Sequence, residues 1–118
     1  MWTVLFDEEF RTEFRAFDAA VRRQIAAYAK LLEHDGPELG RPWADTLKGS
    51  KHPNMKELRP TVDKVEWRVA YAFDPERKAV VLVAAAKHGG SKFYRQLIGT
   101  ADDRFDTHLR RLRQGMGS

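Results

Sequence analysis

Basic and aromatic side chains recur at the ends of the strands that the second half of the sequence predicts. Arg68 alternates with large apolar residues and therefore lies on the opposite face of its strand. Lys87 and His88 directly follow an apolar run, and Tyr94 comes a few residues later. If the strands form a meander, these side chains converge on one face of a sheet. Further positive charge nearby comes from Lys48, Lys56, Arg59 and Lys92.

This set of residue types suits cleavage of RNA by its own 2′-hydroxyl group, which attacks the adjacent phosphate. Arg68 and Lys87 could stabilise the charge that builds on the phosphoryl oxygens. His88 is a candidate acid or base, because imidazole can change its charge near neutral pH. Tyr94 could stack on a base or donate a proton, and the sequence leaves open whether His88 or Tyr94 is the base.

Each candidate also has a purely structural interpretation. Arg68 could pair with Glu66 or Asp63 across the sheet, and Tyr94 could belong to the core. His88 could be an ordinary loop histidine, and the lysines could simply be solvated. Residue types alone therefore do not decide between a nuclease site and an ordinary polar surface.

The distribution of charge favours a polyanionic partner. The chain of 118 residues has a formal net charge of +4, but residues 47–95 alone carry +6 and the remainder carries −2. A basic middle on a nearly neutral frame is the electrostatic pattern of a nucleic-acid-binding protein.

Several other kinds of site are excluded by composition. The chain has no cysteine, so disulfides and thiolate metal sites are absent, and its four histidines stand at no zinc-ligand spacing. It contains no phosphate-binding glycine loop and no serine nucleophile elbow. No apolar run approaches the ~18 residues that span a membrane, and the first residues lack the features of a signal peptide. We therefore expect a cytoplasmic protein.

The element pattern predicts one α+β domain over residues 1–114, followed by a flexible tail at 115–118. Residues 36–54 are rich in proline and glycine and are expected to form a long loop. The expected elements are a strand at Val4 and Phe6, a short helix through Phe10 and Phe14, a longer helix capped by Asp18, strands at 55–59, 66–73 and 79–86, and a helix capped by Thr100.

Several short motifs, taken in order, match a known family. They are Gly36-Pro37, Leu39-Gly40-Arg41-Pro42, Leu47-Lys48-Gly49-Ser50, Asn54-Met55-Lys56-Glu57-Leu58-Arg59, Arg68-Val69-Ala70-Tyr71-Ala72-Phe73-Asp74-Pro75, Lys87-His88-Gly89, and Phe93-Tyr94 followed by Ala101-Asp102. With this order and spacing, the chain resembles the HigB-like, phage-related branch of the RelE/ParE toxins from Trp2 to about Leu112.

The resemblance implies a RelE-like fold: an N-terminal helical hairpin packed on a small antiparallel sheet, with a C-terminal helix beside it. It also implies the toxin of a type II toxin–antitoxin system, a ribosome-dependent mRNA endonuclease that acts in the ribosomal A site. The implied partner is a cognate antitoxin, commonly a helix-turn-helix protein, through which alone the toxin reaches operator DNA. No metal or cofactor is implied.

Residue by residue, the resemblance assigns roles to four positions. Arg68 matches the catalytic arginine of RelE-type nucleases, and Tyr94 matches their catalytic tyrosine. Lys87 matches a basic residue at the end of the last strand. His88 stands where RelE has a second catalytic arginine, which is a departure from the RelE pattern.

A further departure lies in the strand at 55–59. RelE has two lysines on one face there, whereas this chain has Met55 and Glu57 at those positions, with Lys56 out of phase. Arg59 is therefore a better candidate than Lys56 for binding the RNA backbone. Lys92 and Lys48 complete the expected RNA-binding set.

Two alternatives share the same fold. One is a non-enzymatic, ParE-like toxin that inhibits DNA gyrase. The other is a degenerate toxin that acts only as a partner of its antitoxin and the operator. A nuclease needs the cluster of Lys87, His88, Lys92 and Tyr94, whereas a gyrase inhibitor does not.

Overall fold

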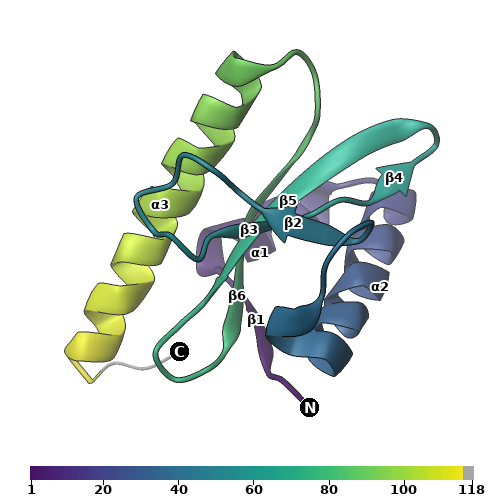
Figure 1. The fold of residues 1–118 in the computed structure, drawn as a ribbon. Helices are drawn as coiled ribbons and strands as arrows, with labels where there is room; N and C mark the ends of the chain where they lie inside the picture. The colour runs from purple at the N-terminus through teal and green to yellow at the C-terminus, as the bar shows by residue number, and fades with distance from the viewer. Residues whose placement is uncertain (116–118) are drawn as a thin grey trace.

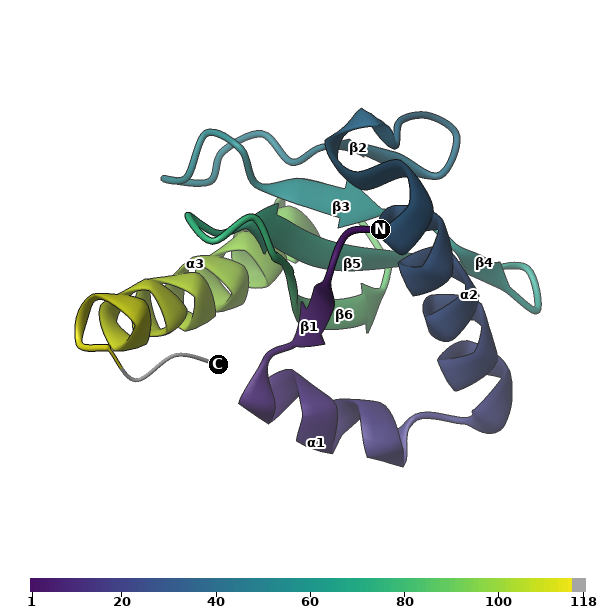
Figure 2. The ribbon, with the colours of Figure 1, turned by 90° about the horizontal axis from the view of Figure 1, so that it is seen from below.

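Helices cover both faces of a mixed β-sheet (Figures 1 and 2). The computed structural model describes residues 1–115, and the strand order is β1-β6-β5-β3-β2, with β4 paired to β5. The elements in chain order are β1 (Val4–Phe6), α1 (Glu8–Ala16), α2 (Ala19–Asp35), a 3-10 turn (Gly36–Glu38), β2 (Ala44–Thr46), β3 (Lys56–Leu58), β4 (Thr61–Val62), β5 (Val65–Phe73), β6 (Ala79–Ala86) and α3 (Ser91–Arg113).

The alternation along β5 divides the interior into two cores. Val69 and Tyr71 are fully buried on the face that α1 and α2 cover, and Trp67 and Phe73 pack against them. Ala70 and Ala72 are buried on the face that α3 covers. The small alanine side chains let α3 approach this face closely. Because side chains alternate along a strand, Arg68 lies on the same face as Ala70 and Ala72.

The α+β architecture, with two N-terminal helices and a C-terminal helix packed on a sheet, is confirmed, but the sheet is not purely antiparallel. β1 pairs in parallel with β6, with Leu5 opposite Val80. After β1 the chain passes through α1 and α2 before it returns to the sheet at β2 (Figure 1). A short turn would have forced an antiparallel pair, whereas this long connection leaves the direction of β1 free.

Three further differences concern the boundaries. Residues 36–54 contain the short strand β2, and β4 follows β3, so the long loop and the number of strands were predicted incorrectly. The C-terminal helix begins at Ser91 and not at Thr100, because an apolar stripe at intervals of four already starts at Phe93. Most of the predicted tail, residues 116–118, lies outside the described residues.

The earlier start of α3 matters for the site, because it puts Tyr94 in the first turn of a helix and not in a loop. The structure also offers no helix in residues 1–115 with the length and apolar character needed to cross a bilayer.

Candidate active site

A hollow of about 570 Å³ lies where β2, β3 and β5 meet the first turn of α3. Its lining comes from five separate segments of the chain. We call it the cationic pocket, and it is lined by Arg41, Asp45, Thr46, Leu47, Lys48, Glu57, Arg59, Arg68, Lys87 and Tyr94. The convergence of Arg68, Lys87, Tyr94, Arg59 and Lys48 agrees with the spatial expectation from the sequence.

Arg68 and Tyr94 are in direct contact at the centre of this pocket. The Nε of Arg68 donates a hydrogen bond to the Tyr94 hydroxyl oxygen at 3.1 Å. The Tyr94 oxygen is thus an acceptor for Arg68, which leaves its own O–H free to donate elsewhere. The separation of 26 residues in sequence is closed by the packing of α3 on β5.

Arg68 is only 2% exposed, and each of its two terminal nitrogens also donates a hydrogen bond. Its Nη2 donates to the Glu66 carboxylate at 2.6 Å, and its Nη1 donates to the Trp67 carbonyl oxygen at 2.9 Å. Burial by itself lowers the pKa of Arg68, but the hydrogen bonds with Glu66 and Tyr94 outweigh it, so the net pKa is raised. The guanidinium is therefore charged at every physiological pH.

The ion pair with Glu66 is the structural interpretation that the sequence offered for Arg68, and the structure contains it. The two partners differ in exposure: the Glu66 side chain is 57% exposed, whereas that of Arg68 is 2% exposed. The carboxylate therefore covers the guanidinium from the solvent side. An anion that displaced Glu66 would meet Arg68 without rearrangement of the core.

Glu57 is a pocket residue to which sequence reasoning assigned no role. Its side chain is buried, its Oε2 accepts a hydrogen bond from Arg59 Nη1 at 2.6 Å, and its Oε1 lies 3.8 Å from Arg68 Nε. This Oε1 atom has no hydrogen-bond partner within residues 1–115. The pairing register of β3 with β5 would have identified Glu57 as a pocket residue, because Glu57 lies opposite Ala70 and thus shares a face with Arg68.

The two lysines of the pocket differ from its arginines. Arg59 pairs with Glu57, whereas Lys48 and Lys87 form no ion pair with any carboxylate in the part of the chain that the structure describes. Free ammonium groups at the edge of a pocket are available to an anionic ligand.

Three of the predicted site residues do not line the cationic pocket. His88 is exposed and packs its ring edge-on against Phe93, with centroids 5.6 Å apart. It borders a separate shallow hollow beside Lys87. Lys92 is exposed in the first turn of α3, and Lys56 points to the opposite face of β3 from Glu57. The roles predicted for these three residues stay predictions.

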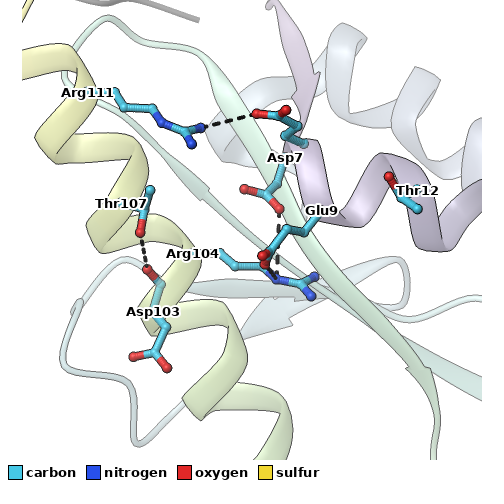
Figure 3. Close-up of a pocket in the computed structure, with 8 residues that line it drawn as sticks. Asp7, Glu9, Thr12, Asp103, Arg104, Thr107 and Arg111 are labelled. Carbon is cyan, nitrogen blue, oxygen red and sulfur yellow. Dashed lines mark hydrogen bonds and ion pairs between the residues drawn. The ribbon is translucent and has the colours of Figure 1, made fainter.

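A second hollow, the α1–α3 groove, has a similar size of about 530 Å³ and lies between α1 and the C-terminal half of α3. Figure 3 shows Arg104 from α3 reaching toward the acidic side chains of α1. Arg104 donates two hydrogen bonds to Glu13, at 2.6 and 2.9 Å, one to Glu9 and one to the Leu82 carbonyl oxygen. The bond with Glu13 is the main cause of the raised pKa of Arg104.

No group of three or more His, Cys, Asp or Glu residues in residues 1–115 is arranged to hold a metal ion. The chemistry that the cationic pocket can perform with its own side chains is stabilisation of an anion by Arg68 and the lysines, together with proton transfer by Tyr94 and Glu57.

Comparison with known sequences gives a consistent set of relatives. A family described as phage-derived protein Gp49-like matches residues 12–106. HigB2 of Mycobacterium tuberculosis, a protein named as a toxin, is 39% identical over 104 residues, which is 86% of this chain. HigB3 of the same organism, also named as a toxin, is 38% identical over 97 residues, or 81% of this chain and 83% of its own length. The match covers only 52% of HigB2, so this chain spans about half of that relative.

Solved structures show the same fold. A double mutant of the E. coli toxin RelE in the free state superposes with a TM-score of 0.60 at 20% identity, covering 87% of this chain and 96% of that one. A chain of the intact E. coli RelBE toxin–antitoxin complex gives a TM-score of 0.55 at 17% identity, covering 75% and 100%.

Proposed function

Because the chain belongs to the phage-derived Gp49-like family, we propose that it is the toxin of a toxin–antitoxin system and that it cuts mRNA on the ribosome. The observation that carries this proposal is the contact between Arg68 and Tyr94 inside a pocket edged by lysines that form no ion pair within residues 1–115. An RNA phosphate is the ligand that this combination of charge and hydrogen-bond donors suits best.

In the proposed reaction, the scissile phosphate replaces the Glu66 carboxylate on Arg68. Both groups offer oxygens to the same guanidinium fork, and Glu66 is exposed enough to move away. Lys48 and Lys87 then hold the neighbouring phosphates of the strand. Arg68 stabilises the additional charge on the phosphoryl oxygens as the 2′-oxygen attacks.

Proton transfer completes the step. The ribose 2′-oxygen forms a bond to phosphorus and gives its proton to Oε1 of Glu57, the buried carboxylate oxygen that accepts no hydrogen bond in the described part of the chain. The bond from phosphorus to the 5′-oxygen breaks, and Tyr94 donates its proton to that oxygen. The products are a 2′,3′-cyclic phosphate and a 5′-hydroxyl end. His88, which borders the neighbouring hollow, is the alternative proton carrier.

The proposed partners follow from the relatives. HigB2 and HigB3 are named as toxins, and a fold neighbour was solved in complex with its antitoxin. We expect an antitoxin, here a helix-turn-helix protein, to neutralise this chain and to connect it to operator DNA. The activity itself requires translating ribosomes and therefore a cytoplasmic location.

The test is expression of the wild type, Arg68→Ala and Tyr94→Phe chains, followed by mapping of mRNA 5′ ends in cells or translation extracts. We expect ribosome-phased ends and growth arrest with the wild type, and neither with a folded Arg68→Ala protein. Circular dichroism and thermal unfolding verify folding, because Arg68 is buried. Full toxicity of folded Arg68→Ala would overturn the assignment, and intact mRNA with DNA damage would favour the gyrase alternative.

A further inference from the structure

The loop between β2 and β3 (residues 47–55) is fastened to α3 by two aspartates one helical turn apart. Asp102 accepts hydrogen bonds from the Ser50 hydroxyl and from the Lys51 backbone N–H. Asp106 forms an ion pair with the Lys51 ammonium and contacts His52 Nε2 at 2.8 Å. Two carboxylates thus bind three consecutive residues at the far side of the loop.

The base of the same loop is fixed by apolar packing. Leu47 and Met55 are buried in the core beneath α3, and the Leu47 N–H donates to the Met55 carbonyl oxygen at 2.9 Å. The His52 ring lies edge-on against Phe105, with centroids 4.9 Å apart. The loop is therefore held at its two ends by the core and in its middle by Asp102 and Asp106.

This attachment joins two parts of the cationic pocket. Lys48 lies between the buried Leu47 and the fastened Ser50, and it lines the pocket. Tyr94 lies on α3, two helical turns before Asp102, and lines the pocket from the other side. Gly49, with φ of +100°, makes the turn that separates Lys48 from the attachment points.

We propose that Asp102 and Asp106 are positioning residues, which hold the β2–β3 loop against α3 and thereby place Lys48 at the phosphate site next to Tyr94. A lysine on an unattached loop would have to be ordered each time the ligand binds, and this ordering reduces affinity. The inference rests on the proposed function, since it takes the ligand of the pocket to be an RNA phosphate.

The neighbouring residue Asp103 provides a matched control. It carries the same charge and is exposed on the same helix, where it lines the α1–α3 groove, and within residues 1–115 its carboxylate forms no hydrogen bond or ion pair with the loop. Asp103→Asn removes the same formal charge from α3 without touching the attachment of the loop.

The experiment measures mRNA cleavage in a translation extract with the toxin in excess, as a function of toxin concentration. For Asp106→Asn and for the pair Asp102→Asn/Asp106→Asn, we expect the half-saturating concentration to rise about tenfold, the value of roughly one lost lysine–phosphate contact. The maximal rate should stay within about twofold. Asp103→Asn should leave both quantities unchanged.

A Lys48→Ala background identifies the group through which the aspartates act. If they position Lys48, adding Asp106→Asn to Lys48→Ala raises the half-saturating concentration no further. Full additivity would overturn the inference, as would an Asp106→Asn chain indistinguishable from Asp103→Asn while the wild type cleaves. A folded wild type that cleaves no mRNA would instead overturn the proposed function.

Discussion

Two hollows of similar size in this molecule contain arginines, and their carboxylate partners are arranged differently. In the α1–α3 groove, Arg104 from one helix binds Glu9 and Glu13 from another, and its Nη1 also donates to a strand carbonyl. In the cationic pocket, Arg68 binds Glu66, which is only two residues away on the same strand. The first arrangement connects separate elements, whereas the second connects neighbours that the backbone already holds together.

This difference indicates which arginine can exchange its carboxylate partner for an anionic ligand. Glu13 connects α1 to α3 through Arg104, which also donates to the Leu82 carbonyl oxygen of β6, so we expect these contacts to contribute to stability. Removing Glu66 from Arg68 separates no elements, and Tyr94 and the Trp67 carbonyl oxygen still hold the guanidinium in place. A buried arginine whose hydrogen-bonded carboxylate is exposed and local is therefore the better candidate for binding an anionic ligand.

Replacing the arginine of each hollow by lysine should give the largest difference in cleavage rate. Lysine at position 68 keeps the charge but loses the planar fork that contacts both Tyr94 and a phosphate. We expect Arg68→Lys to lower the maximal cleavage rate by about 10³-fold, the upper range for loss of one transition-state donor. Arg104→Lys, measured in the same extract, should cleave at the wild-type rate. Equal losses in both variants would contradict the distinction between the hollows.

The next contrast compares two glutamates beside these arginines. Glu57→Gln keeps the size and the contact with Arg59 but cannot accept the 2′ proton, so we expect the maximal rate to fall about 10²-fold. Glu13→Gln, the corresponding change in the α1–α3 groove, should leave the rate unchanged. Single-turnover measurements separate this loss from weaker binding. A Glu57→Gln chain with wild-type rates would transfer the proton role to His88.

The sequence predicted the composition of the cationic pocket better than its contacts. Alternation along β5 placed Arg68 on the face opposite the large apolar side chains, which the structure shows to be the face that α3 covers, and the end of the apolar run placed Lys87 nearby. The helix start was missed because Thr100 and Asp102 are good capping residues, yet packing of Phe93 and Leu97 extends the helix to Ser91. Asp102 in fact binds the β2–β3 loop, a contact between distant segments that no local pattern encodes.

The contacts of Glu57 and the pairing of β1 are also features that local sequence patterns do not predict. Glu57 was recognised as a departure from the family, but its approach to Arg68 depends on the register between β3 and β5, which the sequence did not fix. The parallel direction of β1 depends on the path of the chain through two helices. Periodicity predicts which face a residue occupies, whereas strand order and register decide what it meets there.

The third contrast concerns stability. Arg104→Lys gives up at least one hydrogen bond to Glu13 and the contact with the Leu82 carbonyl oxygen, both at a largely buried guanidinium. We expect it to lower the free energy of unfolding by about 1.5–3 kcal/mol. Arg68→Lys should have a smaller effect, because Glu66 and the Trp67 carbonyl oxygen lie on β5 with residue 68, and only the bond to Tyr94 joins this side chain to α3. Urea unfolding followed by circular dichroism compares the two, and a reversed order would contradict our interpretation of both arginines.

The smallest expected effect tests whether Glu66 competes with the ligand. Glu66→Gln removes the charge that covers Arg68, so we expect the half-saturating toxin concentration to fall about twofold to fivefold, in line with the low value of exposed ion pairs. Glu8→Gln is the control, since Glu8 is an exposed partner of Arg111 in the α1–α3 groove.

The pH dependence of this effect follows from the ion pair. The hydrogen bond from Arg68 lowers the pKa of Glu66, so the carboxylate stays ionised even below its ordinary pKa. The ion pair is lost only as the pH falls through the lowered value. Between about pH 6 and pH 8 the competition is therefore constant, and the ratio of wild-type to Glu66→Gln affinities should not change. An unchanged affinity in Glu66→Gln would mean that the phosphate reaches Arg68 by a path that does not displace this carboxylate.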